Sequence, residues 1–156
     1  MVYIFLFLLI VCIDQFTKYL AYNRLRLGGS KIIIENFLKF TYVENTGAAF
    51  GIFSQKTGIL SIVTILVCII LGFYFIKNYS SLNTIVKISF TMILAGAIGN
   101  LIDRIFRGFV VDFVSFRLFS FYDFPVFNVA DIFVVLGAFL MFIFALFMDE
   151  GNKIDG

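Results

Sequence analysis

The sequence predicts a small, mainly α-helical membrane protein that crosses the bilayer four times. Its composition and its long apolar stretches both support this fold class. Of the 156 residues, 62% are hydrophobic and 14% are charged, and the mean hydropathy is +1.04. A soluble domain averages about 45–50% apolar and about 25% charged residues, so a water-soluble domain is excluded.

Four stretches are long enough to span a membrane. A spanning helix needs about 20 mostly apolar residues, because the hydrocarbon core is about 30 Å thick and a helix rises about 1.5 Å per residue. The predicted spans cover residues 2–22, 57–76, 84–102 and 127–148. The first has no basic segment before it and no A-x-A-like site after it, so we expect a retained helix rather than a cleaved signal peptide.

The two long connections between these spans are expected to carry structure. Residues 31–42 are rich in β-branched and aromatic side chains and lie between turn signals, which predicts short strands. Residues 103–126 alternate aromatic and charged positions and contain the single proline, Pro125. We expect an interfacial element here, with the fourth helix beginning just beyond Pro125.

The orientation in the membrane stays open at this point. With four spans both termini lie on the same side, where Lys77, Lys87 and Lys153 are the basic residues. The positive-inside rule would place the long connections in the cytoplasm, because they and their edges hold more basic residues. A folded site at the outer surface would give those residues structural roles instead. They are Arg24, Arg26, Lys31, Lys39, Lys56, Arg104, Arg107 and Arg117.

The chain contains no histidine, and this excludes several chemistries. It rules out Ser-His and Cys-His nucleophile pairs, bis-imidazole haem and His-ligated zinc. We expect neither a metal nor an organic cofactor. The net charge of +2 and the lack of basic runs argue against a nucleic-acid partner. Acid-base chemistry must therefore come from Asp, Glu, Lys or Tyr.

Aspartates near the membrane are the first candidates for that chemistry. A charge at membrane depth costs at least about 2.5 kcal/mol, so such residues are usually functional. Asp14 and Lys18 are four residues apart on one helix face, which predicts a structural ion pair. Asp103 and Arg104 are adjacent at the end of the third span, and we expect them to have separate partners.

Asp112 and Asp131 differ from these because neither has a basic residue within four positions. They lie at the exit of the third span and the entrance of the fourth, and therefore at the same membrane face. Two carboxyl groups brought together in a low dielectric share a proton, which provides a general acid and a general base for attack of water on an amide. The alternative is two aspartates that cap helix ends, and spacing alone favours neither interpretation.

Two further segments contain small residues that allow close approach. Asn45 precedes Gly47 in ENTGAAFGIF, which could bring backbone close to a ligand or form an ordinary turn. Ala95, Gly96 and Gly99 in the third span are typical of close helix packing.

Five motifs together resemble a known family. DQFTK at 14–18, ENTGAAFGIF at 44–53, AGAIGNLIDR at 95–104, GFVVDF at 108–113 and FPVFNVAD at 124–131 have the order and spacing of bacterial lipoprotein signal peptidase, also called signal peptidase II. The resemblance covers nearly the whole chain. Each motif alone is weak, but five in order are highly specific.

The resemblance implies an aspartic peptidase domain over residues 1–156, with Asp112 and Asp131 as the catalytic dyad. It would remove signal peptides from diacylglyceryl-modified prolipoproteins by cleavage before the lipid-modified cysteine. Its partners would be this substrate and membrane lipid, and we expect a monomer. The residues implied to bind substrate or support the dyad are Asp14, Lys18, Asn45, Asn100, Asp103, Arg104 and Asn128.

The family fold implied by the resemblance has four transmembrane helices, a small extracytoplasmic β-cradle at residues 28–54 and a short interfacial helix between the third and fourth spans. The protein would lie in the bacterial cytoplasmic membrane, with cytoplasmic termini and an outward-facing dyad. This orientation conflicts with the loop charges counted above.

Two other classes of function remain. A small carboxylate-dependent ion or proton transporter also needs buried carboxylates, but such proteins usually have repeated halves and helices broken at mid-membrane. No repeat is visible in this sequence, and its carboxylates cluster at one face. A non-catalytic membrane scaffold is the third possibility, and an isosteric change in its aspartates would alter no activity.

Overall fold

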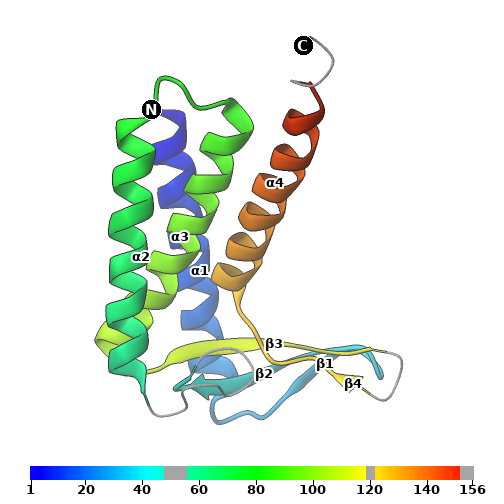
Figure 1. The fold of residues 1–156 in the computed structure, drawn as a ribbon. Helices are drawn as coiled ribbons and strands as arrows, with labels where there is room; N and C mark the ends of the chain where they lie inside the picture. Colours follow the sequence, from blue (N-terminus) through cyan, green and yellow to red (C-terminus); the bar gives the residue numbers. More distant parts are fainter. Residues whose placement is uncertain (48–55, 119–121, 152–156) are drawn as a thin grey trace.

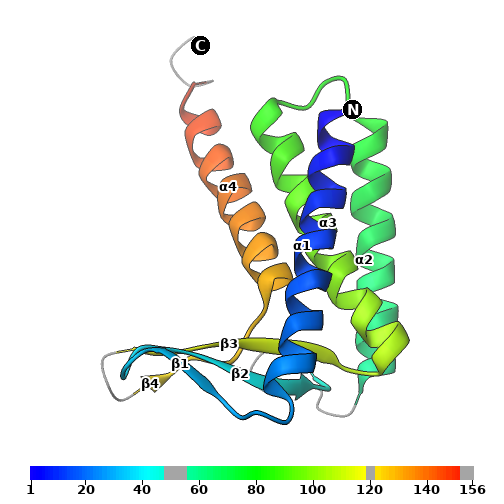
Figure 2. The same ribbon diagram turned by 180° about the vertical axis from the view of Figure 1, so that it is seen from behind.

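The structure is a computed structural model that describes residues 1–47, 56–118 and 122–151, with side chains described as far as residue 147. Four helices lie side by side, and a four-stranded sheet lies across one end of them (Figure 1). The start of the first helix and the end of the last helix lie at the opposite end from the sheet (Figure 2). Residues 48–54 of the expected cradle lie outside the described residues.

The four predicted spans are confirmed as helices long and apolar enough to cross a membrane. They are α1 (Val2–Leu25), α2 (Thr57–Lys77), α3 (Thr84–Arg107) and α4 (Val129–Gly151). Helix α3 continues five residues past the predicted end at residue 102, because Asp103 and Arg104 end the apolar run without ending the helix. The helix ends at Gly108, whose φ of 80° is a left-handed conformation that favours glycine.

The strands β1 (Lys31–Ile34), β2 (Leu38–Asn45), β3 (Val110–Leu118) and β4 (Tyr122–Asp123) form an antiparallel sheet in the order β1-β2-β3-β4. The strands expected within residues 31–42 are therefore confirmed, and β2 extends to Asn45. In the β2–β3 register Asn45 pairs with Val110 and Val43 pairs with Asp112. This register brings the end of β2 beside the aspartate of the VVDF motif.

The short helix expected between α3 and α4 is replaced by strands in the described residues. The run from Val110 to Leu118 is rich in β-branched and aromatic residues, which suit a pleated and partly buried surface. It pairs with β2 along most of its length, and Phe127 forms an isolated bridge to Val114. This bridge leads the chain from the sheet back to the start of α4.

Helix α3 lies at the centre of the bundle and packs against α1, α2 and α4. Its small residues permit the closest approaches, as the sequence predicted. A Cβ added at Gly96 would lie 2.4 Å from the carbonyl oxygen of Ala130, and one added at Gly99 would lie 2.6 Å from a carboxylate oxygen of Asp14. Any side chain at these positions would therefore push α1 or α4 away from α3.

We expect Gly96→Ala to lower the stability by about 1–3 kcal/mol, because the new methyl group would overlap Ala130 and Val134 of α4. Thermal unfolding of the purified protein in detergent measures this. The matched control is Gly72→Ala on α2, where a Cβ has no atom within 4 Å. Equal melting temperatures for both variants would show that α3 and α4 are not packed this closely.

Candidate active site

A groove of about 830 Å³ opens where α3 and α4 meet the sheet. Asp112 and Asp131 both line it, so the two carboxylates singled out in the sequence face the same cavity. The apolar part of its lining includes three side chains of α4, namely Ile132, Val135 and Leu136. The groove therefore combines a pair of acids with an apolar wall.

Asp112 is 2% exposed and lies on β3. Its Oδ2 accepts a hydrogen bond of 2.8 Å from the side-chain amide of Asn45, and its Oδ1 accepts one of 2.6 Å from the amide of Asn128. Burial raises the pKa of Asp112 to about 7, with a smaller contribution from the charge of Asp131, while the two amides oppose the rise. Asp112 can therefore hold a proton near neutral pH.

Asp131 lies in the first turn of α4 and is held by polar groups of α3 and of its own helix start. Its Oδ1 accepts a hydrogen bond of 2.7 Å from the amide of Asn100, and its Oδ2 accepts one of 3.2 Å from the backbone N–H of Asn128. The side-chain oxygen of Asn128 in return accepts from the backbone N–H of Asp131 at 3.0 Å. This reciprocal pattern is that of a capping box.

Asn128 therefore hydrogen-bonds both carboxyl groups. Its side-chain amide donates to Asp112 and its backbone N–H donates to Asp131. The same amide also lies 3.1 Å from the side-chain oxygen of Asn100. Because Asn128 is completely buried, it holds the two acids in a fixed relation.

Behind the groove lies a buried ionic cluster centred on Lys18. The predicted ion pair with Asp14 is confirmed at 2.9 Å, and Lys18 also contacts Asp103 at 3.2 Å. It donates a third contact of 2.8 Å to the side-chain oxygen of Asn100. An ammonium group has three donors, and here each has an oxygen partner. The ionic side chains of all three charged residues are 0% exposed.

Each partner of Lys18 also forms a hydrogen bond with Asp131 or with the residue before Asp131 or Asp112. Asp14 accepts the backbone N–H of Ala130, the residue before Asp131, at 2.9 Å. Asp103 accepts the backbone N–H of Val111, the residue before Asp112, at 3.0 Å, and also pairs with Arg107. Lys18 donates a hydrogen bond to the side-chain oxygen of Asn100. The side-chain nitrogen of Asn100 is therefore turned toward Asp131, to which it donates.

Arg104 has different partners from its neighbour Asp103, as predicted. It lines the groove and donates to the carbonyl oxygen of Gly47 at 3.4 Å. Its Nε is buried and has no hydrogen-bond partner among the described residues. Arg104 therefore lies at the groove with one buried N–H that no described group accepts.

Gln15 is a site residue that the sequence analysis missed. Its side-chain amide bridges the carboxylate of Asp14 at 3.1 Å and the carbonyl oxygen of Gly99 at 3.0 Å. Its polarity within a spanning helix was the available signal. In the part of the chain that the structure describes, no group of three or more Cys, Asp or Glu side chains could hold a metal ion.

Comparison with known proteins shows the family of this chain. The family model described as signal peptidase (SPase) II matches residues 6–147. The chain belongs to the signal peptidase II family. This match includes all the residues of the groove and of the ionic cluster.

Relatives of this signal peptidase II chain match along nearly their whole length. A lipoprotein signal peptidase of Fusobacterium nucleatum is 39% identical, with 99% of this chain and 92% of the relative covered. One of Clostridium novyi is 45% identical, with 87% and 91% covered. A solved bacterial membrane enzyme, determined by the in meso method at 2.3 Å resolution, has a TM-score of 0.87 and 39% identity, with 99% and 93% covered.

We expect Lys18→Met to destabilise this signal peptidase II chain by about 3–5 kcal/mol, because Asp14 and Asp103 would stay buried without the cation between them. Thermal unfolding in detergent measures the loss. Adding Asp14→Asn should restore part of it by removing one uncompensated charge. Lys77→Met, at the end of α2, is the control and should change stability by less than about 0.5 kcal/mol. Equal effects of the two lysine variants would contradict the role given to the cluster.

Proposed function

We propose that this chain is an integral membrane aspartic endopeptidase that removes the signal peptide from diacylglyceryl-modified prolipoproteins, with Asp112 and Asp131 as its catalytic dyad. Cleavage occurs before the lipid-modified cysteine. The observation that supports this best is the meeting of two carboxyl groups in one largely apolar groove. Such a groove suits a substrate that is part peptide and part lipid.

We assign the resting proton of the dyad to Asp112. The raised pKa of this buried carboxyl favours its neutral form. Asp131 lies in the first turn of α4, where the helix dipole favours a negative charge, and it accepts two hydrogen bonds. Asp112 is then the general acid and Asp131 the general base.

Hydrolysis proceeds through a water molecule held between the two carboxyl groups. Asp131 takes a proton from this water while the oxygen of the water attacks the scissile carbonyl carbon. At the same time Asp112 donates its proton to the carbonyl oxygen. The tetrahedral intermediate then breaks its C–N bond. Asp131 passes its proton to the leaving amine, and Asp112 recovers a proton from the hydroxyl of the intermediate. Both groups return to their starting states.

The groove has separate features for the two parts of the substrate. Ile132, Val135 and Leu136 offer apolar surface to the diacylglyceryl chains, and each methylene buried contributes about 0.8 kcal/mol. The guanidinium group of Arg104 and the amide of Asn45 line the groove and can bind carbonyl oxygens of the peptide next to the dyad. The membrane and the protein therefore share the binding of the substrate.

We place the dyad at the extracytoplasmic face of the bacterial cytoplasmic membrane. Three of the eight basic residues that oppose this orientation pair with carboxylates within the protein: Arg26 pairs with Glu44, Arg107 with Asp103 and Arg117 with Asp123. Basic residues with such structural roles are a weak signal of the cytoplasmic side. The domain comprises residues 1–156 and acts as a monomer, with lipid and prolipoprotein as its partners and with no nucleic acid.

A transporter is not favoured. Transporter sites typically lie near mid-membrane, between helices that are interrupted there. Here Asp112 lies on the sheet and Asp131 in the first turn of α4, and α1 to α4 are each continuous over the stated bounds.

We expect Asp112→Asn and Asp131→Asn each to lower kcat by about 10²–10⁴-fold, because each keeps the shape of the side chain but removes its proton transfer. Release of the signal peptide from a lipid-modified prolipoprotein measures this, and thermal unfolding checks that each variant is folded. Glu35→Gln, which changes an exposed carboxyl group that lines neither cavity, is the control and should keep wild-type activity.

Substantial cleavage by either purified dyad variant would contradict the assignment. Asp103→Asn should act through stability, because Asp103 contacts Lys18 and the backbone of Val111 rather than the groove. If Asp103→Asn instead gave a protein with native melting and no activity, the dyad would have been assigned to the wrong pair.

The pH dependence of kcat/KM follows from the role of protonated Asp112 as the general acid. Because its pKa is about 7, kcat/KM should fall about tenfold per pH unit above that value as the general acid loses its proton. Asn45→Ala removes an amide that stabilises the ionised carboxylate, so the pKa should rise and the alkaline limb should move to higher pH. A fluorogenic lipopeptide measures the profile. Asn78→Ala, at the end of α2, is the control, and an unmoved or lowered limb in Asn45→Ala would contradict this role of Asp112.

A further inference from the structure

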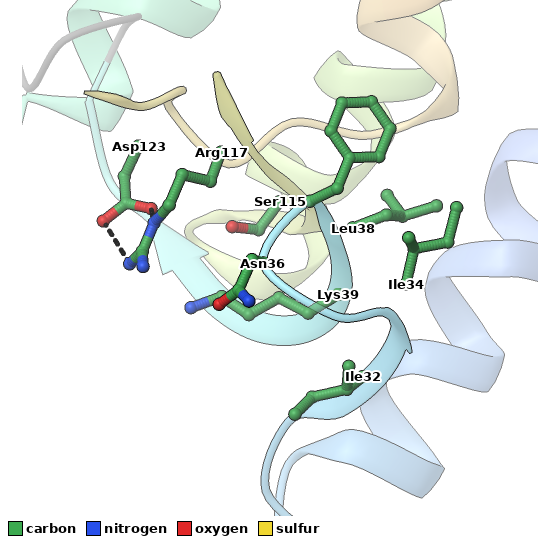
Figure 3. Close-up of a pocket in the computed structure, with 9 residues that line it drawn as sticks. Ile32, Ile34, Asn36, Leu38, Lys39, Ser115, Arg117 and Asp123 are labelled. Carbon is green, nitrogen blue, oxygen red and sulfur yellow. Dashed lines mark hydrogen bonds and ion pairs between the residues drawn. The ribbon is translucent and has the colours of Figure 1, made fainter. Parts of the chain in front are cut away.

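A second cavity, of about 170 Å³, lies on the sheet and shares none of its described lining residues with the catalytic groove (Figure 3). Side chains alternate between the two faces of a strand, so on β3 Asp112 faces one side while Ser115 and Arg117 face the other. The lining residues are Ile32, Ile34, Asn36, Phe37, Leu38, Lys39, Ser115, Arg117 and Asp123.

The polar side of this cavity is built from β2 and β3. Lys39 pairs with Ser115 in the sheet register, so their side chains are neighbours on one face. Figure 3 shows the Ser115 hydroxyl, the Lys39 ammonium and the Arg117 guanidinium turned toward the same side. Ser115 is only 4% exposed, and its hydroxyl makes no side-chain hydrogen bond to another described residue. The cavity therefore contains the hydroxyl of a largely buried serine beside two cations.

Among the described lining residues, two cations share one carboxylate, because the charge of Asp123 acts on both Arg117 and Lys39. Asp123 holds Arg117 through two contacts, of 2.8 and 3.1 Å, which fix the guanidinium in place. Lys39 has no carboxylate within ion-pair distance among residues 1–47, 56–118 and 122–147. The cavity thus has a net positive charge and several donors, which suits a group with a negative charge and several acceptor oxygens.

Apart from Asn36, the remaining lining is apolar. Ile32, Ile34 and Phe37 are 65%, 52% and 49% exposed, although they are large hydrophobic side chains. The sheet crosses one end of the four helices (Figures 1 and 2). Because these helices are long enough to span the hydrocarbon core, we infer that this end lies at the level of the lipid headgroups. A free ligand such as inorganic phosphate would use the cations but not these side chains.

We propose that this cavity binds the phosphate of an anionic phospholipid at the membrane surface. The phosphate oxygens accept hydrogen bonds from Lys39, from Ser115 and from N–H groups of Arg117 that do not contact Asp123. The glycerol and the first carbons of the acyl chains lie against Ile32 and Ile34. A lipid bound in this way ties the sheet to the bilayer, on the opposite face of β3 from Asp112.

The test measures lipid binding directly and is independent of peptidase activity. The full chain, purified in a neutral detergent, is titrated with phosphatidylglycerol, with phosphatidylcholine and with inorganic phosphate, and native mass spectrometry counts the bound molecules. Phosphatidylglycerol should bind best. Lys39→Gln should weaken this binding about fivefold, the effect typical of one basic residue at an anionic surface. The matched control is Lys31→Gln, a lysine of β1 that does not line the cavity, and it should change binding less than twofold.

Three results would overturn the proposal. Equal losses in Lys39→Gln and Lys31→Gln would indicate general attraction to a basic surface. Equal binding of the two lipids would remove the role of net charge. Binding of inorganic phosphate that depends on Lys39, without retained lipid, would replace the lipid by a free ion. Thermal unfolding of each variant checks that it is folded, and Ser115→Ala, which removes only the hydroxyl, should also weaken phosphatidylglycerol binding.

Discussion

The candidate active site depends on one buried ammonium group. Lys18 is the cation of a cluster that includes Asp14 and Asp103, and its three contacts join α1 to α3. The two carboxylates then accept backbone N–H groups beside Asp131 and Asp112. Ions buried at membrane depth are costly unless each is paired, so the cluster is stable only when all its members are in place. The need to pair the charge of Lys18 thus positions both Asp112 and Asp131.

The groove gives its two acids different surroundings, although both are aspartates. Asp112 belongs to a strand and is enclosed by side chains, whereas Asp131 belongs to the first turn of a helix whose dipole stabilises a negative charge. Amides of asparagine hold both carboxyl groups. Since an amide orients a carboxyl group without adding a charge, the site can keep one acid neutral and the other ionised.

Local sequence patterns predicted much of the fold and some of the site. Hydropathy is enough to find the four spans, and the spacing of Asp14 and Lys18 is enough to predict their pair. The contact between Lys18 and Asp103 could not be predicted in this way, because it joins residues far apart in the chain. The composition of the segment from Val110 to Leu118 suits a strand, but its register depends on pairing with β2, which is distant in the sequence. A segment whose structure depends on a distant partner is outside the reach of a local pattern.

The contacts of Asn128 have a consequence for how the site responds to movement of α4. Helices respond to a mismatch with the hydrocarbon thickness by tilting. A tilt of α4 would displace its first turn, but Asn128 joins that turn to the carboxyl groups of both Asp131 and Asp112. The two acids are therefore expected to move as one unit when the helix moves, which would make their spacing insensitive to the lipid composition around them.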